Sequence, residues 1–548
     1  MRRSLEDIGH VWETDVLILG TGAAGCGAAI AAREHGVRAL MVDKGRLESS
    51  GCLGGGNDHF MAVLNSGPEN DSTRALVDFY KGPMSGYTEA MIESYVRAMP
   101  PILRILEEMG VEFIRNPDGS YVRTTGFGQP GNWFIEIENG WNVKRRIARK
   151  IRTMGVEILD HVMVTRLLRS GGRIAGALGY HVLDGTFHIM MANAVVLALG
   201  NSANRATTNS TGNPFNTWHS PYNTGSQFVL AYEAGARLIN LDLKQQATLT
   251  PKGFGSAGMN GINSVGAFEL NALGERFMGR YHPLMENGPR REQIQGTFQE
   301  MLEGKGPPFH VDMRHCDQEA VRHLQYVLMP GDKATFLDYS EQKGIDFEKH
   351  PMEVELSEIE LSGMLQTDEN FESTLPGLFN GCVFYSFSGS MCSGYLAGGS
   401  AAASLPPNRT PIPIDLPEAE RERERVLLPL GIGEGIPYQE YESAVRQVMK
   451  YYMGYVRNRQ GMELVLDRLD LIESRTDRIK ADDFHGLMRA NEAIHLLKTC
   501  RLSTRATLER KESGRAIYRR SDYPEKKERY NRSLALWQEQ GQMRTAWL

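Results

Sequence analysis

Residues 15–43 read DVLILGTGAAGCGAAIAAREHGVRALMVD, and this stretch decides the fold of the amino-terminal part of the chain. A short apolar run is followed by the glycine-rich turn GTGAAG, an alanine-rich helical segment and a second apolar run that stops at an aspartate. A strand, a helix and a second strand in this register form a βαβ unit of the dinucleotide-binding type. The sequence therefore predicts a Rossmann-like α/β domain.

The turn carries the residue types that a phosphate site requires. Gly20 permits the tight turn, Gly22 lets the backbone approach a pyrophosphate, and Gly25 lets the helix pack closely against its strand. The N–H groups of the helix N-terminus then point at the phosphates. Asp43 follows about 20 residues later, where a carboxylate accepts the ribose hydroxyls and disfavours a 2′-phosphate. The predicted ligand is therefore FAD or NAD.

The composition indicates a globular protein with more than one domain. The chain has 548 residues, of which 41% are hydrophobic and 23% charged. A net charge of −6 lacks the excess of basic residues that is typical of nucleic-acid-binding proteins. We see no apolar run long enough to span a membrane and no signal peptide, and the six cysteines show no metal-ligand spacing. We therefore expect a cytoplasmic protein with reduced thiols and no metal site of its own.

A second glycine-rich stretch, SSGCLGGGNDHFMA, occupies residues 49–62. Three consecutive glycines, Gly54 to Gly56, are unfavourable inside a helix or strand, but they suit a backbone that lies against a flat ligand. The alternative is an ordinary surface loop.

The rest of the chain divides into segments that differ in hydrophobic periodicity and composition. Helices are expected over 73–113 and 141–155, and the basic stripe of the second of these is interpreted as a solvated face, with an acidic partner as the alternative. Residues 156–200 suggest an antiparallel meander whose last strand returns to the nucleotide domain. The predicted domains are an FAD-binding domain in two parts (1–200 and 371–405), an inserted capping or substrate domain (201–370), a proline-rich linker (406–417) and a C-terminal helical domain (418–548).

Several motifs carry a family resemblance. They include NTWHSPYNTGS (216–226), FSGSMCSGYLAGGSAA (387–402), FHGLMRANEAIH (484–495) and LERKESGRAIYRRSDYP (508–524). The last two lie outside the nucleotide fold and serve no general FAD-binding purpose. With these motifs the chain resembles the fumarate reductase/succinate dehydrogenase flavoprotein superfamily, and within it the alpha subunit of adenylylsulfate reductase looks closest.

The resemblance implies FAD. Some relatives hold it covalently through a histidine before the glycine-rich loop, where this chain has Ser49, so FAD is expected to be non-covalent. Cys382 stands where an acidic residue is usual. A helix opened by Gly389 and Ser390 would direct its positive dipole end at the flavin. The predicted cofactor residues are Gly20, Gly22, Gly25, Asp43, Lys44, Gly55, Gly56, Asn57, Gly200, Gly389 and Ser390.

The substrate ligands of the relatives are replaced. Dicarboxylate members of the superfamily use two histidines and an arginine, but the corresponding segments 243–253, 354–364 and 387–396 contain neither residue type. Buried carboxylates without cations are costly, so succinate and fumarate are not expected as substrates. Adenylylsulfate reductase needs an arginine and a histidine that are also missing, although its asparagine and tryptophan match Asn57 and Trp218. Its active-site glutamate survives only out of register, as Glu138 near Trp141.

The candidate catalytic residues are Arg290, His59, Asn57 and Trp218. Arg290 matches an arginine that shuttles protons in the dicarboxylate branch, which requires desolvation and an acidic neighbour; the alternative is a surface arginine. His59 is a candidate acid or base near neutral pH, or a structural histidine. Further candidates near the flavin are Lys252 and Tyr385, together with Glu358 and Glu360, which share one face of an extended strand and would bind a cationic or hydroxylated substrate unless they are simply solvated.

The predicted function is that of the flavoprotein component of an FAD-dependent oxidoreductase. Hydride passes between a small-molecule substrate and flavin N5, and an iron–sulfur, ferredoxin-like partner protein exchanges the electrons. Two alternatives stay open: a self-sufficient dehydrogenase or oxidase similar to aspartate oxidase, and a non-catalytic flavoprotein in which FAD only relays electrons.

Overall fold

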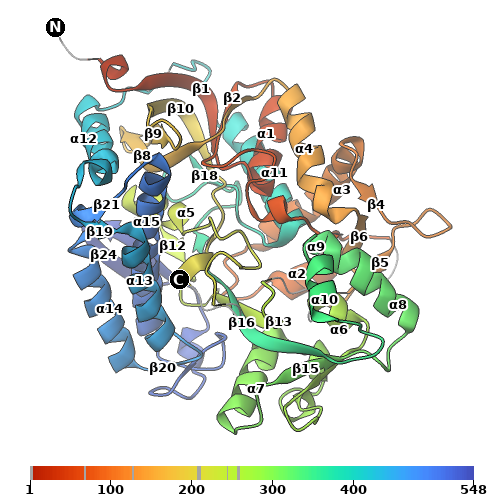
Figure 1. Ribbon diagram of the computed structural model, residues 1–548. Coiled ribbons are helices and arrows are strands. Elements are labelled where there is room, and N and C mark those ends of the chain that lie inside the picture. The colour runs from red at the N-terminus through yellow and green to blue at the C-terminus, as the bar shows by residue number, and fades with distance from the viewer. Residues whose placement is uncertain are drawn as a thin grey trace.

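Buried apolar strands build a seven-stranded sheet at the centre of the amino-terminal region (Figure 1). The computed structural model describes residues 4–66, 69–125, 129–206, 212–243, 245–255, 259–410 and 412–548. The sheet order is β7-β2-β1-β10-β9-β8, with β18 also paired to β10. Its parallel strands are β1 (His10–Leu19), β2 (Ala39–Val42), β7 (Glu157–Leu159), β10 (Phe187–Leu197) and β18 (Leu378–Asn380).

The predicted meander is present for three strands. β8 (Val162–Ser170), β9 (Arg173–His181) and β10 pair antiparallel in chain order. β7 is not part of the meander, because it pairs parallel with β2 at the opposite edge of the sheet. The last strand of the meander thus returns to lie beside β1, which completes the parallel core of the nucleotide fold.

Two helices pack against each other so closely that only glycine fits at their contacts. They are α1 (Ala23–Glu34) and α11 (Ser386–Ala403). A Cβ on Gly394 would lie 1.8 Å from the carbonyl oxygen of Ala24, and one on Gly27 would lie 2.1 Å from the carbonyl oxygen of Met391. This contact ties the last part of the nucleotide fold to the first.

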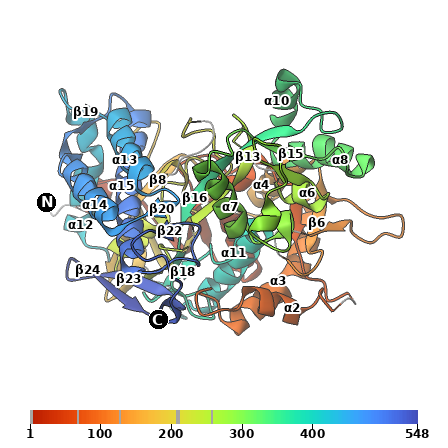
Figure 2. The same ribbon diagram turned by 90° about the horizontal axis from the view of Figure 1, so that it is seen from below.

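The middle of the chain forms a second sheet, seen below the nucleotide fold in Figure 1 and from a second direction in Figure 2. Its strands run in the order β11-β16-β15-β14, with β13 also paired to β16. The helix α7 (Arg290–Leu302) contacts β13 and β16. The strand bounds are β11 (Ser202–Ala203), β13 (Gln245–Pro251), β14 (Phe268–Leu270), β15 (Phe309–Asp312) and β16 (Met352–Ser362).

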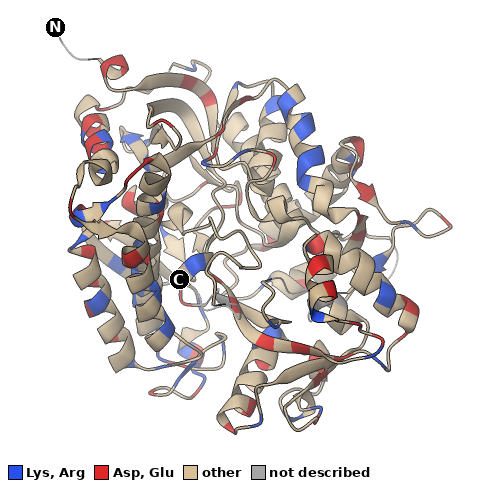
Figure 3. Cartoon of the chain, in the orientation of Figure 1, with Lys and Arg blue, Asp and Glu red and all other residues tan. Residues whose placement is uncertain are grey.

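A small antiparallel sheet and three helices follow the nucleotide unit in the chain. The sheet contains β3 (His59–Met61), β4 (Glu112–Phe113), β5 (Arg123–Thr124) and β6 (Phe134–Glu138). The helices are α2 (Thr73–Tyr80), α3 (Glu89–Glu108) and α4 (Val143–Thr153), in the segments where helices were predicted. The basic residues of α4 appear as blue bands in Figure 3.

The carboxyl-terminal region is helical only as far as Glu509. It contains α12 (Leu416–Leu427), α13 (Tyr438–Tyr452), α14 (Arg459–Glu473) and α15 (Phe484–Glu509). The remainder was predicted to be helical as well, but it ends in the hairpin of β23 (Leu534–Glu539) and β24 (Gln542–Trp547), and β23 pairs with β12 (Leu238–Ile239). Gln540 and Gly541 connect the two strands by a two-residue turn in which both residues have positive φ. A glycine in such a pair is typical of hairpin turns, so the sequence contained a local signal for the hairpin.

None of the helices in the described ranges is both long enough and apolar enough to cross a membrane.

Candidate functional site

The glycines of the first turn fall into two groups. Gly20 has φ +102°, and a Cβ there would lie 2.2 Å from the carbonyl oxygen of Ala198, while one on Gly25 would lie 1.9 Å from the carbonyl oxygen of Gly20. The chain's own packing therefore requires these two. A Cβ on Gly22 would meet only the Cα of Gly51, at 3.6 Å, and one on Gly55 would meet nothing within 4 Å. These two glycines border open space.

This open space fits the phosphates of a dinucleotide. Helix α1 begins directly after Gly22, so its first N–H groups and its positive dipole end face the space beside the turn. Lys144, in the first turn of α4, is buried and donates a hydrogen bond to the carbonyl of Thr21. The sequence prediction missed this lysine because it assigned the basic stripe of α4 to solvent.

Asp43 is fixed at the edge where the ribose of a dinucleotide lies in this fold. One carboxylate oxygen accepts hydrogen bonds from the backbone N–H (2.7 Å) and the hydroxyl (3.0 Å) of Thr21. The other accepts from the N–H of Gly45, at 2.8 Å. Asp43 thereby joins the loops that follow β1 and β2.

Lys44 points away from the turn. Its ammonium group donates to the carbonyl of Tyr222 (2.7 Å) and pairs with Glu492 of α15 (2.6 Å). Glu492 is fully buried and also pairs with Arg205 (2.8 Å) and Arg489 (2.6 Å). Burial raises the pKa of Glu492, but the three cations outweigh that effect and lower it to about 2. In this structure Lys44 thus links the nucleotide fold to the carboxyl-terminal helices.

One predicted cofactor segment, the helix after Tyr385, is built differently from expectation. Helix α11 begins at Ser386, which has φ +75°, so Gly389 and Ser390 lie one turn inside the helix and do not open it. The N–H of Gly389 is already bonded to the Ser386 hydroxyl, at 3.2 Å. Gly200 has φ +85°, and a Cβ there would lie 2.5 Å from the side chain of Asn223.

Asn57 and His59 hold the second glycine-rich stretch in place. Gly56 has φ +118° and packs against the carbonyl of Gly331, and the Asn57 side-chain oxygen accepts from the N–H of His59 at 3.0 Å. The imidazole Nδ1 of His59 lies 2.5 Å from Asp58, and its ring stacks on Phe134 at 4.0 Å. Burial lowers the pKa of His59, but the carboxylates of Asp58, Asp332 and Glu136 together outweigh burial, and the net shift of the pKa is upward.

Arg290 and Trp218, which are 72 positions apart in the chain, lie together. Arg290 is the first residue of α7, and its guanidinium carbon lies 5.7 Å from the centre of the Trp218 ring. Burial lowers the pKa of Arg290 to about 10, and the Glu360 carboxylate opposes the shift. The desolvation and the acidic neighbour that a functional role requires are therefore both present.

Glu360 and Glu358 do not share a face, in contrast to the sequence expectation. The register between β13 and β16 shifts so that Gln246 faces Glu360, Ala247 faces Glu358, and Ile359 is left over as a bulge. The charge of Glu358 consequently acts on the side chains of Tyr455 and Arg457, where it favours the protonated forms.

Glu360 faces the other way, toward Arg290. Only 3% of its side chain is exposed, and one carboxylate oxygen lies 2.9 Å from Nδ1 of His219. The other oxygen is buried, and no residue in the described ranges hydrogen-bonds it.

Cys52 lies close to this cluster. Neighbouring atoms desolvate its thiol and, together with the nearby charge of Glu360, raise the pKa of the thiol to about 12, although the residue as a whole is exposed. Burial and Glu360 likewise raise the pKa of Tyr385, which is partly accessible. We call Arg290, Trp218, Glu360, His219 and Cys52 the Arg290 cluster.

Other candidates lie elsewhere or were missed. Lys252 is half exposed and pairs with Glu353 at 2.6 Å, outside the cluster. Lys333, which the sequence prediction did not single out, donates to the carbonyl of Thr217 at 3.3 Å, and burial lowers its pKa. His219 was also missed, although it follows Trp218 directly in a motif already noted.

Comparison with known proteins identifies the class of protein. A profile of the FAD binding domain matches residues 15–380, and a profile of the fumarate reductase flavoprotein C-terminal region matches residues 442–547. The chain is therefore an FAD-dependent oxidoreductase. It belongs to the fumarate reductase/succinate dehydrogenase flavoprotein family, as its motifs predicted.

Individual relatives cover nearly the whole chain. The chain is 27% identical over 559 residues to one of the subunits of the CoM/CoB fumarate reductase of Methanothermobacter marburgensis, which covers 96% of this chain and 97% of the relative. It is 26% identical over 337 residues to the alpha subunit of the adenylylsulfate reductase of Megalodesulfovibrio gigas, which covers 54% of this chain and 49% of the relative. The structure of adenylylsulfate reductase from Archaeoglobus fulgidus has the same fold, with a TM-score of 0.85 at 22% identity over 100% of this chain and 97% of the other.

Proposed function

We propose that the chain is the flavoprotein subunit of a two-electron oxidoreductase, and that the Arg290 cluster binds and protonates or deprotonates a small-molecule substrate. When bound, FAD supplies the hydride chemistry. The observation that carries the proposal is the buried oxygen of Glu360 that no described residue hydrogen-bonds, in a carboxylate whose charge acts on Arg290. A surface cluster has no reason to maintain such a costly buried carboxylate.

The two charged residues suit different tasks. A pKa of about 10 leaves Arg290 protonated near neutral pH, so its main task is to bind an anionic or hydrogen-bond-accepting group of the substrate. The contact with the face of the Trp218 ring, at 5.7 Å, helps to hold the guanidinium in place. Glu360 and His219 together form a pair that is able to hold and move one proton, which a hydride transfer to or from carbon requires.

The negative charge of Glu360 also limits which substrates the site is able to bind. A dicarboxylate would bring a second negative group into a site where one wall is a carboxylate. We infer a substrate that directs an anionic or acceptor group at Arg290 and a hydrogen-bond donor at Glu360. Succinate and fumarate fit this description poorly.

FAD is proposed to be held without a covalent bond. Ser49, at the register of the histidine that forms the bond in some relatives, has a hydroxyl in place of an imidazole. Gly20, Gly22, Gly25, Asp43, Gly55, Gly56, Asn57 and Gly200 would bind the cofactor, while Lys44, Gly389 and Ser390 would support its loops.

Variants of the cluster test the substrate site. We would assay the FAD-loaded protein with reduced viologen dye and a panel of small unsaturated and oxidised acids. The proposal expects at least one compound to oxidise the dye. Arg290→Gln and Glu360→Gln should each lower kcat/KM at least 100-fold with unchanged FAD content, whereas Lys252→Gln should have no effect. Equal loss of FAD and activity in the cluster variants, or no effect of either variant, would contradict the assignment.

An iron–sulfur protein is the proposed electron partner. The two relatives named above are each one subunit of an enzyme, which supports an assembly. Affinity purification of the tagged chain from its own host should co-purify a small, cysteine-rich protein with iron and acid-labile sulfide. Rapid reoxidation of the reduced isolated chain by air, with no such partner, would favour the self-sufficient oxidase instead.

A further inference from the structure

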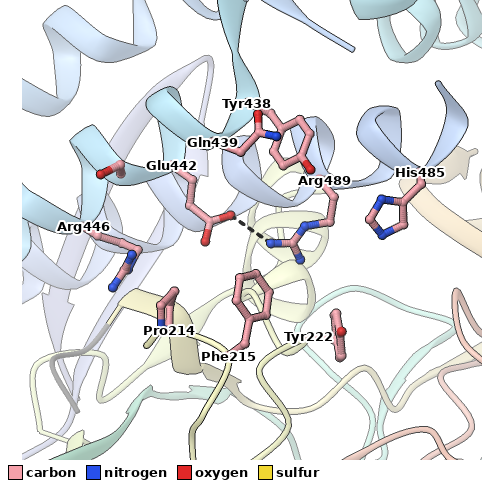
Figure 4. Close-up of a pocket in the computed structure, with 10 residues that line it drawn as sticks. Pro214, Phe215, Tyr222, Tyr438, Gln439, Glu442, Arg446, His485 and Arg489 are labelled. Carbon is pink, nitrogen blue, oxygen red and sulfur yellow. Dashed lines mark hydrogen bonds and ion pairs between the residues drawn. The ribbon is translucent and has the colours of Figure 1, made fainter. Parts of the chain in front are cut away.

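A second cavity, of about 310 Å³, lies between the segment 212–222 and the amino ends of α13 and α15 (Figure 4). None of the glycines or acids assigned to FAD lines it. Its walls combine aromatic rings with arginines, and the lining residues are Pro214, Phe215, Tyr222, Tyr438, Gln439, Glu442, Ser443, Arg446, His485 and Arg489.

The cavity floor is a buried network with excess positive charge. Arg205 forms two hydrogen bonds to Glu442, at 2.7 and 3.1 Å, and pairs with Glu492 at 2.8 Å. Arg489 pairs with the same two carboxylates, at 3.5 and 2.6 Å, and Lys44 pairs with Glu492. Three cations thus share two carboxylates, which leaves a net charge of +1.

Arg446 adds a fourth cation. Its Nε is buried and has no hydrogen-bond partner among the described residues, and burial lowers its pKa. Among the described residues, four cations therefore face two carboxylates. Because uncompensated buried charge is costly, the cavity is suited to an anion.

The helices reinforce this charge. Tyr438 is the first residue of α13, and His485 is the second residue of α15. Both helices, of 15 and 26 residues, direct their positive dipole ends at the cavity.

The aromatic walls select for a flat group. The Phe215 ring lies 5.2 Å from the Arg205 guanidinium and 4.6 Å from that of Arg489, and 44% of its surface is exposed. The Tyr222 ring is 48% exposed and lies 6.3 Å from Phe215. Figure 4 shows both rings below the arginines, with Tyr438 above. A planar ring is able to stack against these faces while its charge reaches Arg446.

We propose that this cavity binds a planar aromatic anion, a ring that carries a carboxylate or a phosphate, at a site separate from the flavin. Tyr222 lines the cavity with its ring, and its carbonyl holds Lys44 next to Asp43. An occupant therefore contacts the same residue that anchors the nucleotide loop.

Calorimetric titration of the FAD-loaded protein tests the proposal. The probes are benzoate and phenyl phosphate, with inorganic phosphate as an anion without a ring and benzamide as a ring without charge. At least one aromatic anion should bind ten times more tightly than either control compound. Arg446→Gln should weaken it at least tenfold, and Phe215→Leu should remove the preference for a ring.

Lys450→Gln is the matched control, because it removes an exposed cation one turn further along α13. Its affinity for the probe should equal that of the wild type. Unchanged affinity in Arg446→Gln with native FAD content, or no preference for aromatic anions, would overturn the proposal. Binding of the aromatic anions to the FAD-free protein but not to the FAD-loaded protein would also overturn the proposal, because it would show that the cavity is part of the flavin site.

Discussion

Replacing Gly55 by alanine separates a glycine needed for a ligand from one needed for the fold. A Cβ at Gly55 meets no protein atom within 4 Å, and its φ lies outside the left-handed region. The apoprotein should therefore keep its free energy of unfolding within about 0.5 kcal/mol of wild type, as for surface changes generally. If a flat ligand lies against this backbone, the added methyl group must displace it, and overpacking of this kind costs about 1–3 kcal/mol. The dissociation constant of FAD should rise roughly 5- to 150-fold.

The measurement is a fluorescence titration of the apoprotein with FAD, together with thermal unfolding of the same sample. Gly82→Ala is the control, because a Cβ at Gly82 also meets nothing within 4 Å and the residue lies beyond α2, away from both glycine-rich turns. It should change neither quantity. Wild-type FAD affinity in Gly55→Ala would refute the assignment of the 54–56 glycines to the cofactor.

Three further predictions concern packing, charge and attachment. Gly394→Ala places a Cβ 1.8 Å from the Ala24 carbonyl oxygen, so α1 and α11 must separate, and thermal unfolding should show a loss of about 3 kcal/mol or more. The pKa of Glu492 is lowered from 4.5 to about 2, so its stabilisation, about 3 kcal/mol, is complete above pH 4.5 and is lost as the pH falls toward 2. Glu492→Gln should abolish that part of the acid denaturation curve, unlike the exposed control Glu440→Gln. Acid precipitation should release all FAD into the supernatant; yellow colour in the pellet that disappears in Cys52→Ser would instead indicate a thioether bond.

Local patterns predicted the nucleotide fold because its determinants are close in sequence. The turn from Gly20 to Gly25, its helix and Asp43 lie within one βαβ unit, and the structure has the tight turn at Gly20 and the close packing at Gly25 that the sequence predicted. The contacts of Gly22 and Asp43 with a dinucleotide stay predictions. The hairpin at the carboxyl terminus also had a local signal, in Gln540 and Gly541. It was missed because the helical prediction for the charged segment before it was continued to the end of the chain.

The candidate site was harder to predict because long-range pairing decides it. The bulge at Ile359 exists only when β16 meets β13, and it alone separates Glu358 from Glu360. The partner of Lys44 is 448 positions away, so no residue near Lys44 in the sequence indicates that it pairs with Glu492. Arg290 was recognisable from its family, but its burial against Trp218 depends on a loop far from it in the chain.

The two candidate binding sites are connected through one segment. Residues 212–222 supply Trp218 and His219 to the Arg290 cluster, and they supply Phe215 and Tyr222 to the second cavity. The same segment contacts the nucleotide loop through the Tyr222 carbonyl and Lys44. We therefore expect a ligand that packs against Phe215 and Tyr222 to restrict Trp218, three residues from Phe215, and through Trp218 the Arg290 guanidinium. Coupling of this kind requires a difference in contacts between two states of the segment, and Trp218 fluorescence is the observable that reports it.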